Sequence, residues 1–250
     1  MPERDDELYV GYLPQAPPGV AAWTRRVVAL VFVVVAALAV VLAAAQRPFS
    51  KAVFEFGVER RFEGVMRADP HPVLEVARPG VAPDSGTVSR YLLVNPFKHG
   101  AEIGGHDGER VRLSGSLIYR DDLTMLEILP EETEPLERGA PPSPERHFGP
   151  HTLVGRIVDS KCYLGVMKPG AGKTHRACAA RCISGGVPPL FVVSDRQGPA
   201  LQLLLVGADG RALNREVLDF VAETLEVRGE VVVKDDLWFL MADPETYRRL

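Results

Sequence analysis

The sequence predicts a mainly β protein, in which one N-terminal transmembrane helix is followed by two OB-like small β-barrel repeats. The second barrel is expected to carry a short helical Cys/His insertion. Three observations predict this architecture: a long apolar run lies near the amino terminus, two later stretches resemble each other, and all 3 cysteines lie in one short segment. The apolar run indicates a membrane, the repeat indicates two related domains, and the cysteines indicate where reactive side chains are concentrated.

The apolar run covers residues 27–45 and contains no charged residue. At about 1.5 Å per residue, a helix of this length spans about 28 Å, close to the hydrocarbon thickness of a bilayer. Because no face of this helix is polar, a core helix of a soluble domain is a poor alternative. A cleaved leader is the main alternative, since Arg25 and Arg26 before the run and the alanines at 43–45 that end it resemble a twin-arginine signal. We expect a retained anchor.

The charges that flank this run predict its orientation. Arg25 and Arg26 favour a cytoplasmic tail over residues 1–26, and long domains cross the membrane largely regardless of the opposing Arg47 and Lys51. We therefore expect a single-pass protein of the cell membrane, with its carboxy-terminal domain on the exterior or periplasmic side. The cysteines then lie in an oxidising compartment, where disulfides persist. The expected partners are the membrane itself, through residues 27–45, and an envelope protein.

The charge of the chain and one of its motifs argue against nucleic acids and nucleotides as ligands. The net charge is −4 and no stretch gathers five or six like charges, so the basic footprint of a nucleic-acid-binding protein is missing. The stretch GAGKTH at 170–175 resembles a phosphate-binding loop, but that pattern requires glycine where Met167 stands. We expect neither a nucleic acid nor a nucleotide as ligand.

The repeat consists of GSLIYRDDLTML at 115–126 and GEVVVKDDLWFL at 229–240. Each half of the chain offers about five short β-runs separated by turn residues, and a small OB-like barrel is the architecture that hides the edges of so few strands. The predicted domains are a first barrel at 52–130 and a second at 151–250. The Pro-rich, polar stretch 131–150 between them is expected to be a linker.

Two local patterns predict further elements. The pairs Asp121-Asp122 and Asp235-Asp236 recur at equivalent places, which favours hairpin turns over acid–base chemistry because aspartate tolerates turn backbone. Residues 214–225 have apolar side chains at helical spacing, and Asn214 is a suitable N-cap. A helix is therefore expected there.

The cysteine segment, residues 159–186, begins as a strand, turns at glycines and continues as a short helix. On that helix His175, Cys178 and Cys182 stand at i, i+3 and i+7, and Cys162 precedes the turn. These four residues are the candidate ligands for zinc, iron or copper. Positions i and i+7 are about 10 Å apart along a helix, so a site of Cys162, Cys178 and either His175 or Cys182 is geometrically simpler.

Other interpretations of the cysteines stay open. A disulfide between Cys162 and Cys178 or Cys182 would staple the loop and contribute about 3 kcal/mol. Cys178 in the first helical turn, near His175, could instead be a reactive thiol, and cysteines also pack simply as small apolar residues. Asp159 and Lys161, which flank Cys162, are expected to be charges on the strand surface; the alternative is that they support the ligands from behind.

The segment also carries a resemblance. The string V-D-S-K-C-Y-x-G-V-M-K-P-G, followed by K-T-H-R-A-C-A and C-I-S-G-G-V-P-P, resembles a segment of uncharacterised bacterial membrane-anchored or exported proteins. It covers residues 155–192. The resemblance implies no catalytic assignment; it implies that Cys162, His175, Cys178 and Cys182 are the polar members of the motif.

Together these patterns predict a membrane-tethered, exported binding or assembly module with a Cys/His-stapled loop, and not an enzyme. No Ser-His-Asp or Cys-His pair can be placed in space from the sequence, so no catalytic residue is assigned. The alternative is a metal-binding or thiol-redox protein that uses Cys162, His175, Cys178 and Cys182.

Overall fold

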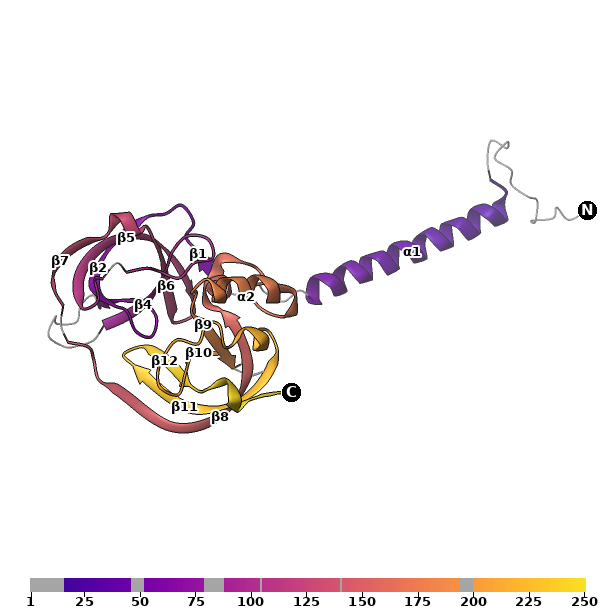
Figure 1. Ribbon diagram of the computed structural model, residues 1–250. Helices are drawn as coiled ribbons and strands as arrows, with labels where there is room; N and C mark the ends of the chain where they lie inside the picture. Colours follow the sequence, from indigo (N-terminus) through magenta and orange to yellow (C-terminus); the bar gives the residue numbers. More distant parts are fainter. Residues whose placement is uncertain (1–15, 46–51, 79–87, 104, 140, 194–199) are drawn as a thin grey trace, which may run out of the picture. The chain divides into compact units, whose positions relative to one another are not determined.

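The computed structural model of this 250-residue chain describes residues 16–45, 52–78, 88–103, 105–139, 141–193 and 200–250. The chain divides into two units, Met1–Ser50 and Lys51–Leu250 (Figure 1). Residues 1–15 of the expected tail lie outside the described residues, as do Arg47 and Lys51, which entered the orientation argument.

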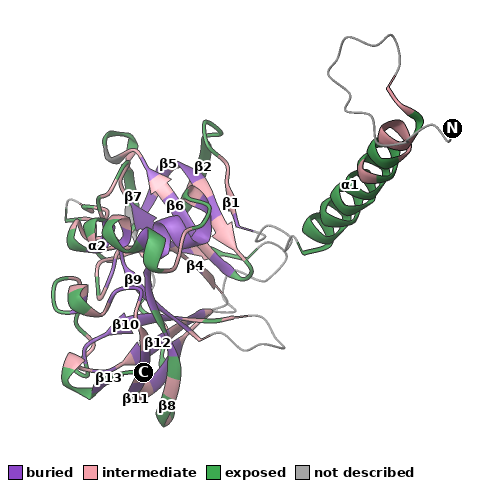
Figure 2. Ribbon diagram, turned by 90° about the vertical axis from the view of Figure 1, so that its right-hand side faces the viewer, coloured by how far each residue is buried: buried purple, intermediate pink, exposed green. Residues whose placement is uncertain are grey.

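The first unit contains the helix α1 (Pro18–Ala45), in which no residue is buried (Figure 2). Proline suits the start of a helix because its missing N–H would have no partner there. Within the described residues, α1 is the one helix long and apolar enough to cross a membrane. The helix expected over 27–45 is confirmed and begins earlier, at Pro18. Such a helix fits either a membrane anchor or a signal sequence.

The second unit begins with a closed barrel of five strands. Its strands follow the order β5-β2-β3-β4-β6, and the pairing of β5 with β6 closes the barrel. Only β4 and β6 pair in parallel among these five. The strands of this sheet are β1 (Val53–Phe54), β2 (Arg60–Arg67), β3 (Val73–Ala77), β4 (Val88–Val94), β5 (Glu109–Arg120), β6 (Leu123–Ile128) and β7 (Glu134–Arg138).

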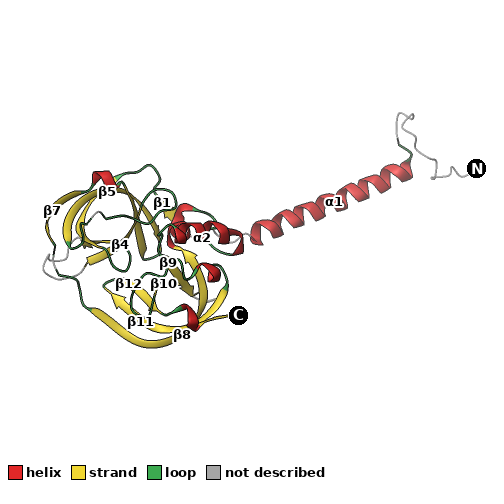
Figure 3. Cartoon of the chain, in the orientation of Figure 1, coloured by secondary structure: helices red, strands yellow, loops and turns green. Residues whose placement is uncertain are grey.

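A second closed barrel follows with the same strand order, β11-β8-β9-β10-β12, closed by β11 and β12. Its one parallel pair, β10 with β12, occupies the same place as β4 with β6. This shared order, with one parallel pair at closure, confirms the mainly β, OB-like class, with 44% of residues in strands (Figure 3). The strands are β8 (Glu145–Asp159), β9 (Pro189–Val193), β10 (Leu201–Val206), β11 (Thr224–Lys234), β12 (Leu237–Met241) and β13 (Tyr247–Arg249).

Three apolar cores hold the second unit together. One fills the first barrel around Leu74 and Leu113, and one fills the second around Phe191 and Leu240. The third joins side chains of both barrels with the cysteine segment, where Cys162 and Cys182 are among its members. Burying apolar surface contributes about 25 cal/mol per Å², so this shared core fixes the two barrels and the cysteine segment to one another.

The two barrels also exchange polar contacts at their hairpin turns. In the first barrel, Arg90 on β4 is almost fully buried and its Nε donates to Asp235 Oδ2 of the second barrel at 2.6 Å. In the second barrel, Gln202 on β10 donates through Nε2 to Asp121 Oδ2 of the first barrel at 3.3 Å. Each barrel thus presents the turn before its last barrel strand to the third strand of the other, as in a self-complementary interface.

The parallel ladders make Arg90 and Gln202 equivalent positions. Each lies two residues before the leucine that pairs with the closing strand; the pairs are Leu92 with Met125 and Leu204 with Phe239. The guanidinium of Arg90 also pairs with buried Glu75. The first barrel therefore has a buried ion-pair network at the place where the second has a single neutral donor.

The predicted hairpin turns are confirmed. Asp121 joins β5 to β6 and Asp235 joins β11 to β12, with φ of 53° and 54°. Positive φ is uncommon outside glycine, and aspartate is one of the residues that tolerate it. The recurring acidic pairs are explained by this shared backbone geometry.

The expected linker at 131–150 is largely strand. The strand β7 (Glu134–Arg138) pairs with β5 of the first barrel, and β8 starts at Glu145. The first ten residues of β8 are mostly exposed, so they lack the clean apolar alternation by which a strand is recognised. Their partner strand β11 lies far along the chain, which supplies the pairing that the local sequence does not reveal.

The prediction of a helix over 214–225 is wrong. This stretch forms turns and a short 3₁₀ helix at Leu218–Phe220, and β11 starts at Thr224. Asn214 caps no helix there; its Nδ2 donates to the carbonyls of Ile183 and Val187 at 2.8 and 2.9 Å. The helical spacing of apolar residues instead reflects burial of the turns against the second core.

The two equivalent positions predict unequal contributions to stability. Replacing Arg90 by methionine removes the cation that Glu75 and Asp235 share and leaves Arg67 as the remaining partner of buried Glu75, so we expect a loss of about 3 kcal/mol in the free energy of unfolding. Gln202→Met removes one neutral hydrogen bond and should cost about 1 kcal/mol. Urea unfolding of the full chain in detergent, followed by tryptophan fluorescence, measures both. Equal losses would contradict the asymmetry.

Candidate metal centre

The cysteine segment lies between β8 and β9 of the second barrel. The strand β8 ends at Asp159, the π-helical turn Cys162–Val166 follows, and α2 (Arg176–Ser184) leads toward β9. The turn packs closely on the first barrel, because a Cβ at Gly165 would clash with the backbone of Val53. The short helical Cys/His insertion expected from the sequence is confirmed in the second barrel.

The three thiols converge. The sulfur atoms of Cys162, Cys178 and Cys182 all lie within 4.8 Å of one another, and all three are free thiols. Cys178 and Cys182 share one face of α2 because they are four residues apart. Sulfurs bound at about 2.3 Å to one tetrahedral zinc ion lie about 3.8 Å from each other, so a small contraction suffices. This cluster could bind a metal ion.

His175 belongs to a second, overlapping group. Its Nε2 lies 3.1 Å from Asp159 Oδ2, and Asp159 Oδ1 accepts a hydrogen bond from the backbone N of Cys162 at 2.8 Å. Asp159, Cys162 and His175 offer ligand atoms within 4.8 Å of one another, and all three are buried. The four predicted ligands therefore fall into two groups that share Cys162, with His175 in one and Cys178 and Cys182 in the other.

Lys98 is a site residue that the sequence analysis missed. Its Nζ lies 2.8 Å from Cys178 Sγ and 3.8 Å from Cys182 Sγ. It comes from the loop between β4 and β5, so the first barrel completes a site whose thiols belong to the second. No local pattern marks a lysine so far from the cysteines in sequence; only the packing of the barrels brings it there.

Asp159 and Lys161 are buried, which corrects the expectation of surface charges. The Nζ of Lys161 donates to the carbonyls of Asn95 and Phe97, both at 2.8 Å, and pairs with Glu127 at 2.5 Å. These contacts use the three donors of an ammonium group. Because Asn95 and Phe97 precede Lys98, Lys161 fixes the loop that presents Lys98 to the thiols.

The contacts in the cluster separate the thiol pKa values. The pKa of Cys182 is lowered to about 7, first by a hydrogen bond from Cys162 and also by the charge of Lys98. The pKa of Cys162 is raised by that same hydrogen bond, by burial and by Asp159. The pKa of Lys98 is raised, chiefly by its hydrogen bond to Cys178. Cys182 is therefore the thiol whose ionised form Cys162 and Lys98 stabilise.

A pocket of about 670 Å³ opens beside the sulfurs. It is bounded by the loop of Lys98 on one side and by α2 on the other. The lining side chains and backbone belong to Phe97, Lys98, His99, Cys162, Val166, Met167, Cys178, Arg181, Cys182, Ser184 and Gly185. The thiols are therefore reachable from outside although Cys162 and Cys182 are themselves buried.

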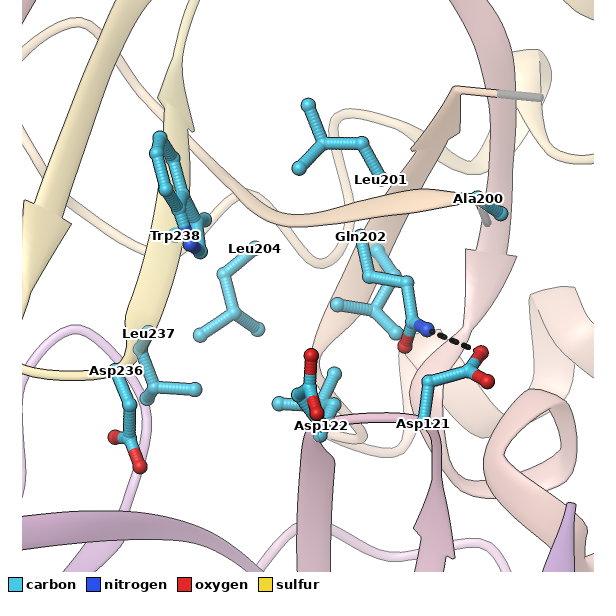
Figure 4. Close-up of a pocket in the computed structure, with 11 residues that line it drawn as sticks. Asp121, Asp122, Ala200, Leu201, Gln202, Leu204, Asp236, Leu237 and Trp238 are labelled. Atoms are coloured by element: carbon cyan, nitrogen blue, oxygen red, sulfur yellow. Dashed lines mark hydrogen bonds between the residues drawn. The ribbon is translucent and has the colours of Figure 1, made fainter. Parts of the chain in front are cut away.

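A smaller pocket of about 240 Å³ lies where the hairpin turns of the two barrels meet. Figure 4 shows the carboxylates of Asp121 and Asp122 on one side and Trp238 on the other, with the dashed bond from Gln202 to Asp121. Its described lining contains no cysteine and no histidine. This pocket belongs to the junction between the barrels and is separate from the sulfur cluster.

No family model, curated protein or solved structure matches the chain. The resemblance of residues 155–192 to exported bacterial proteins stays an expectation. The chemistry of the thiols and of the groups around them is accordingly the basis on which a function is assigned.

The position of Lys98 beside the thiols predicts that it lowers the pKa of Cys182. Lys98→Gln removes the cation beside the thiols, so the pKa of about 7 at Cys182 should rise, because a thiolate is stabilised by a nearby positive charge. Thiolate absorbance of the reduced, metal-free chain against pH measures the change. Lys173→Gln, which removes an exposed lysine outside the contacts of the cluster, is the matched control. Identical curves for the two variants would contradict the role of Lys98.

Proposed function

We propose that this chain is a membrane-tethered, exported module that binds a soft transition-metal ion through Cys162, Cys178 and Cys182. The observation that carries the proposal is the convergence of the three sulfur atoms within 4.8 Å of one another. Thiolates select zinc, copper(I) and iron–sulfur centres, whereas magnesium and calcium prefer oxygen ligands. The donor set therefore defines the class of ion.

A zinc-type site fits the surroundings best. A zinc ion takes four ligands, and sites that act on other molecules keep one position open. Three thiols supply three ligands, and the pocket beside them leaves access to a fourth. Lys98, at 2.8 Å from Cys178 Sγ, would balance the negative charge of three thiolates around a divalent ion.

Asp159 and His175 would act around the ion and not on it. Asp159 holds the backbone of Cys162 and the ring of His175 at once. Such outer contacts orient metal ligands, and their loss commonly lowers metal affinity by about 10- to 100-fold. His175 is thus assigned a supporting place, and the three cysteines are assigned the coordination.

A disulfide between Cys162 and Cys178 or Cys182 is the second candidate. Proximity of the sulfurs is compatible with it, and an oxidising compartment would favour it. A staple, however, uses two thiols and needs neither the third nor the lysine that contacts Cys178 and Cys182. The convergence of all three favours the metal.

In this proposal α1 is the membrane anchor and the barrels lie on the exterior or periplasmic side, where an envelope protein would be the partner. The support is the length and the apolar surface of α1, in which no residue is buried. The barrels would hold the metal centre in a fixed frame, and α1 would tether the chain to the membrane.

Metal analysis tests the metal site. Full-length chain purified in detergent without chelator or reductant should contain about one equivalent of metal, since one three-thiol cluster holds one ion. Serine at Cys162, Cys178 or Cys182 should abolish it, and His175→Ala should weaken it. His106→Ala should leave it unchanged, because His106 contacts Glu109 and belongs to neither group of candidate ligands. Elemental mass spectrometry reads the result and distinguishes zinc from iron and copper. A metal-free chain with one alkylatable thiol would establish the disulfide instead.

Membrane fractionation tests the anchor. Carbonate washing should leave the full-length chain in the membrane pellet, because an apolar helix of this length is held by the hydrocarbon core. A shortened, soluble chain that starts near Gln46 would show that α1 is a cleaved signal.

A further inference from the structure

The pocket beside the thiols has a charge opposite to that of the chain. Its described lining contains the cations Lys98 and Arg181, together with His99, and no acidic residue. The whole protein is acidic, with 33 acidic against 29 basic residues. Three thiolates around a divalent ion leave one negative charge, so these two cations keep the loaded pocket positive, and a positive pocket concentrates anions.

The two cations, Lys98 and Arg181, differ in their contacts. Lys98 contacts the thiols of Cys178 and Cys182. Arg181 is exposed on α2, one residue before Cys182, and within the described residues no salt bridge or hydrogen bond of its guanidinium is found. A free guanidinium at the edge of a pocket suits a carboxylate, which it can bind through two parallel hydrogen bonds.

The three cysteines indicate which donor atom the bound molecule would offer to the metal. An ion that three thiolates bind is one for which sulfur is a suitable ligand, so a further thiolate is a suitable donor for its open position. The apolar wall formed by Phe97, Val166 and Met167 fits the carbon chain of a small organic molecule. The volume of about 670 Å³ leaves room for more than a single atom or water.

We infer that this pocket binds a small anionic thiol, whose sulfur occupies the open position of the metal and whose carboxylate contacts Arg181. The inference rests on the proposed metal site and names its ligand. On binding, the thiol would lose its proton to solvent, and its sulfur would take the open position in place of a water molecule. No electron is transferred, so no oxidant or reductant is required.

Three probes of similar size distinguish the contribution of the thiol from that of the negative charge. The full chain in detergent is loaded with cobalt(II), which reports thiolate coordination by its absorption, and titrated with 3-mercaptopropionate, cysteamine or propionate. We expect 3-mercaptopropionate to increase the sulfur-to-cobalt charge-transfer band. Cysteamine, a cationic thiol, should bind more weakly because it meets Lys98 and Arg181. Propionate, an anion without sulfur, should leave the band unchanged.

Arg181→Gln tests the charge of the pocket. Its side chain is exposed, so the variant should fold and keep its cobalt, while its affinity for 3-mercaptopropionate should fall about three- to tenfold. Its affinity for cysteamine should not fall. Arg228→Gln, which removes an exposed arginine on β11 outside the pocket, is the matched control and should bind as the unmodified chain does.

The outcomes distinguish this inference from the proposal beneath it. A chain that takes up no cobalt overturns both. Cobalt bound with its charge-transfer band unmoved by 3-mercaptopropionate overturns the thiol ligand alone and leaves the metal site in place. Equal affinity for 3-mercaptopropionate and cysteamine, or equal effects of the Arg181 and Arg228 variants, overturns the selection of an anion.

Discussion

The buried ammonium of Lys161 is the constraint on which the second unit depends. A charge only 1% exposed is costly unless it is fully hydrogen-bonded and paired. The first barrel supplies its partners: two carbonyls from one loop and the carboxylate of Glu127. The same loop is pressed against the end of α2, where Gly100 N donates to Gly185 O at 2.9 Å and any Cβ on Gly185 would clash with Lys98 O. One buried cation thereby joins the barrels and fixes Lys98 beside the thiols.

The two barrels share a strand order but differ in what they contribute to the site. At equivalent positions the first has Arg90, held by Glu75 and Asp235, and the second has Gln202 with one neutral hydrogen bond. The long excursion between the first two strands occurs in the second barrel only, where the segment between β8 and β9 carries the thiols. The first barrel acts as a rigid support whose loop reaches into the site of the other, and this division explains why a small module needs both.

Within the site, the soft donor atoms and the positive charges come from different residues. The sulfur atoms of Cys162, Cys178 and Cys182 provide the soft donors, while Asp159 and His175 form a buried pair that orients Cys162 without joining the other thiols. Contacts with Cys162 and Lys98 lower the pKa of Cys182, so metal binding there competes with protons less than at an ordinary thiol. Lys98 stabilises the negative charge and Arg181 stands free at the rim. A thiolate centre under a cationic, partly apolar pocket is suited to binding a soft anion.

The sequence by itself determined what local patterns control. The apolar run, the two Asp-Asp turns, the β-runs and the spacing of Cys178 and Cys182 on one helix depend on neighbours in the chain, and the structure confirms each of them. It placed the cluster in the correct segment. Only the tertiary structure decided that Asp159 and Lys161 are buried, that His175 separates from Cys178 and Cys182, and that 214–225 is not a helix. It alone brought Lys98 to the thiols. These features depend on partners far away in sequence, whose burial and charge outweigh local propensity once the barrels pack.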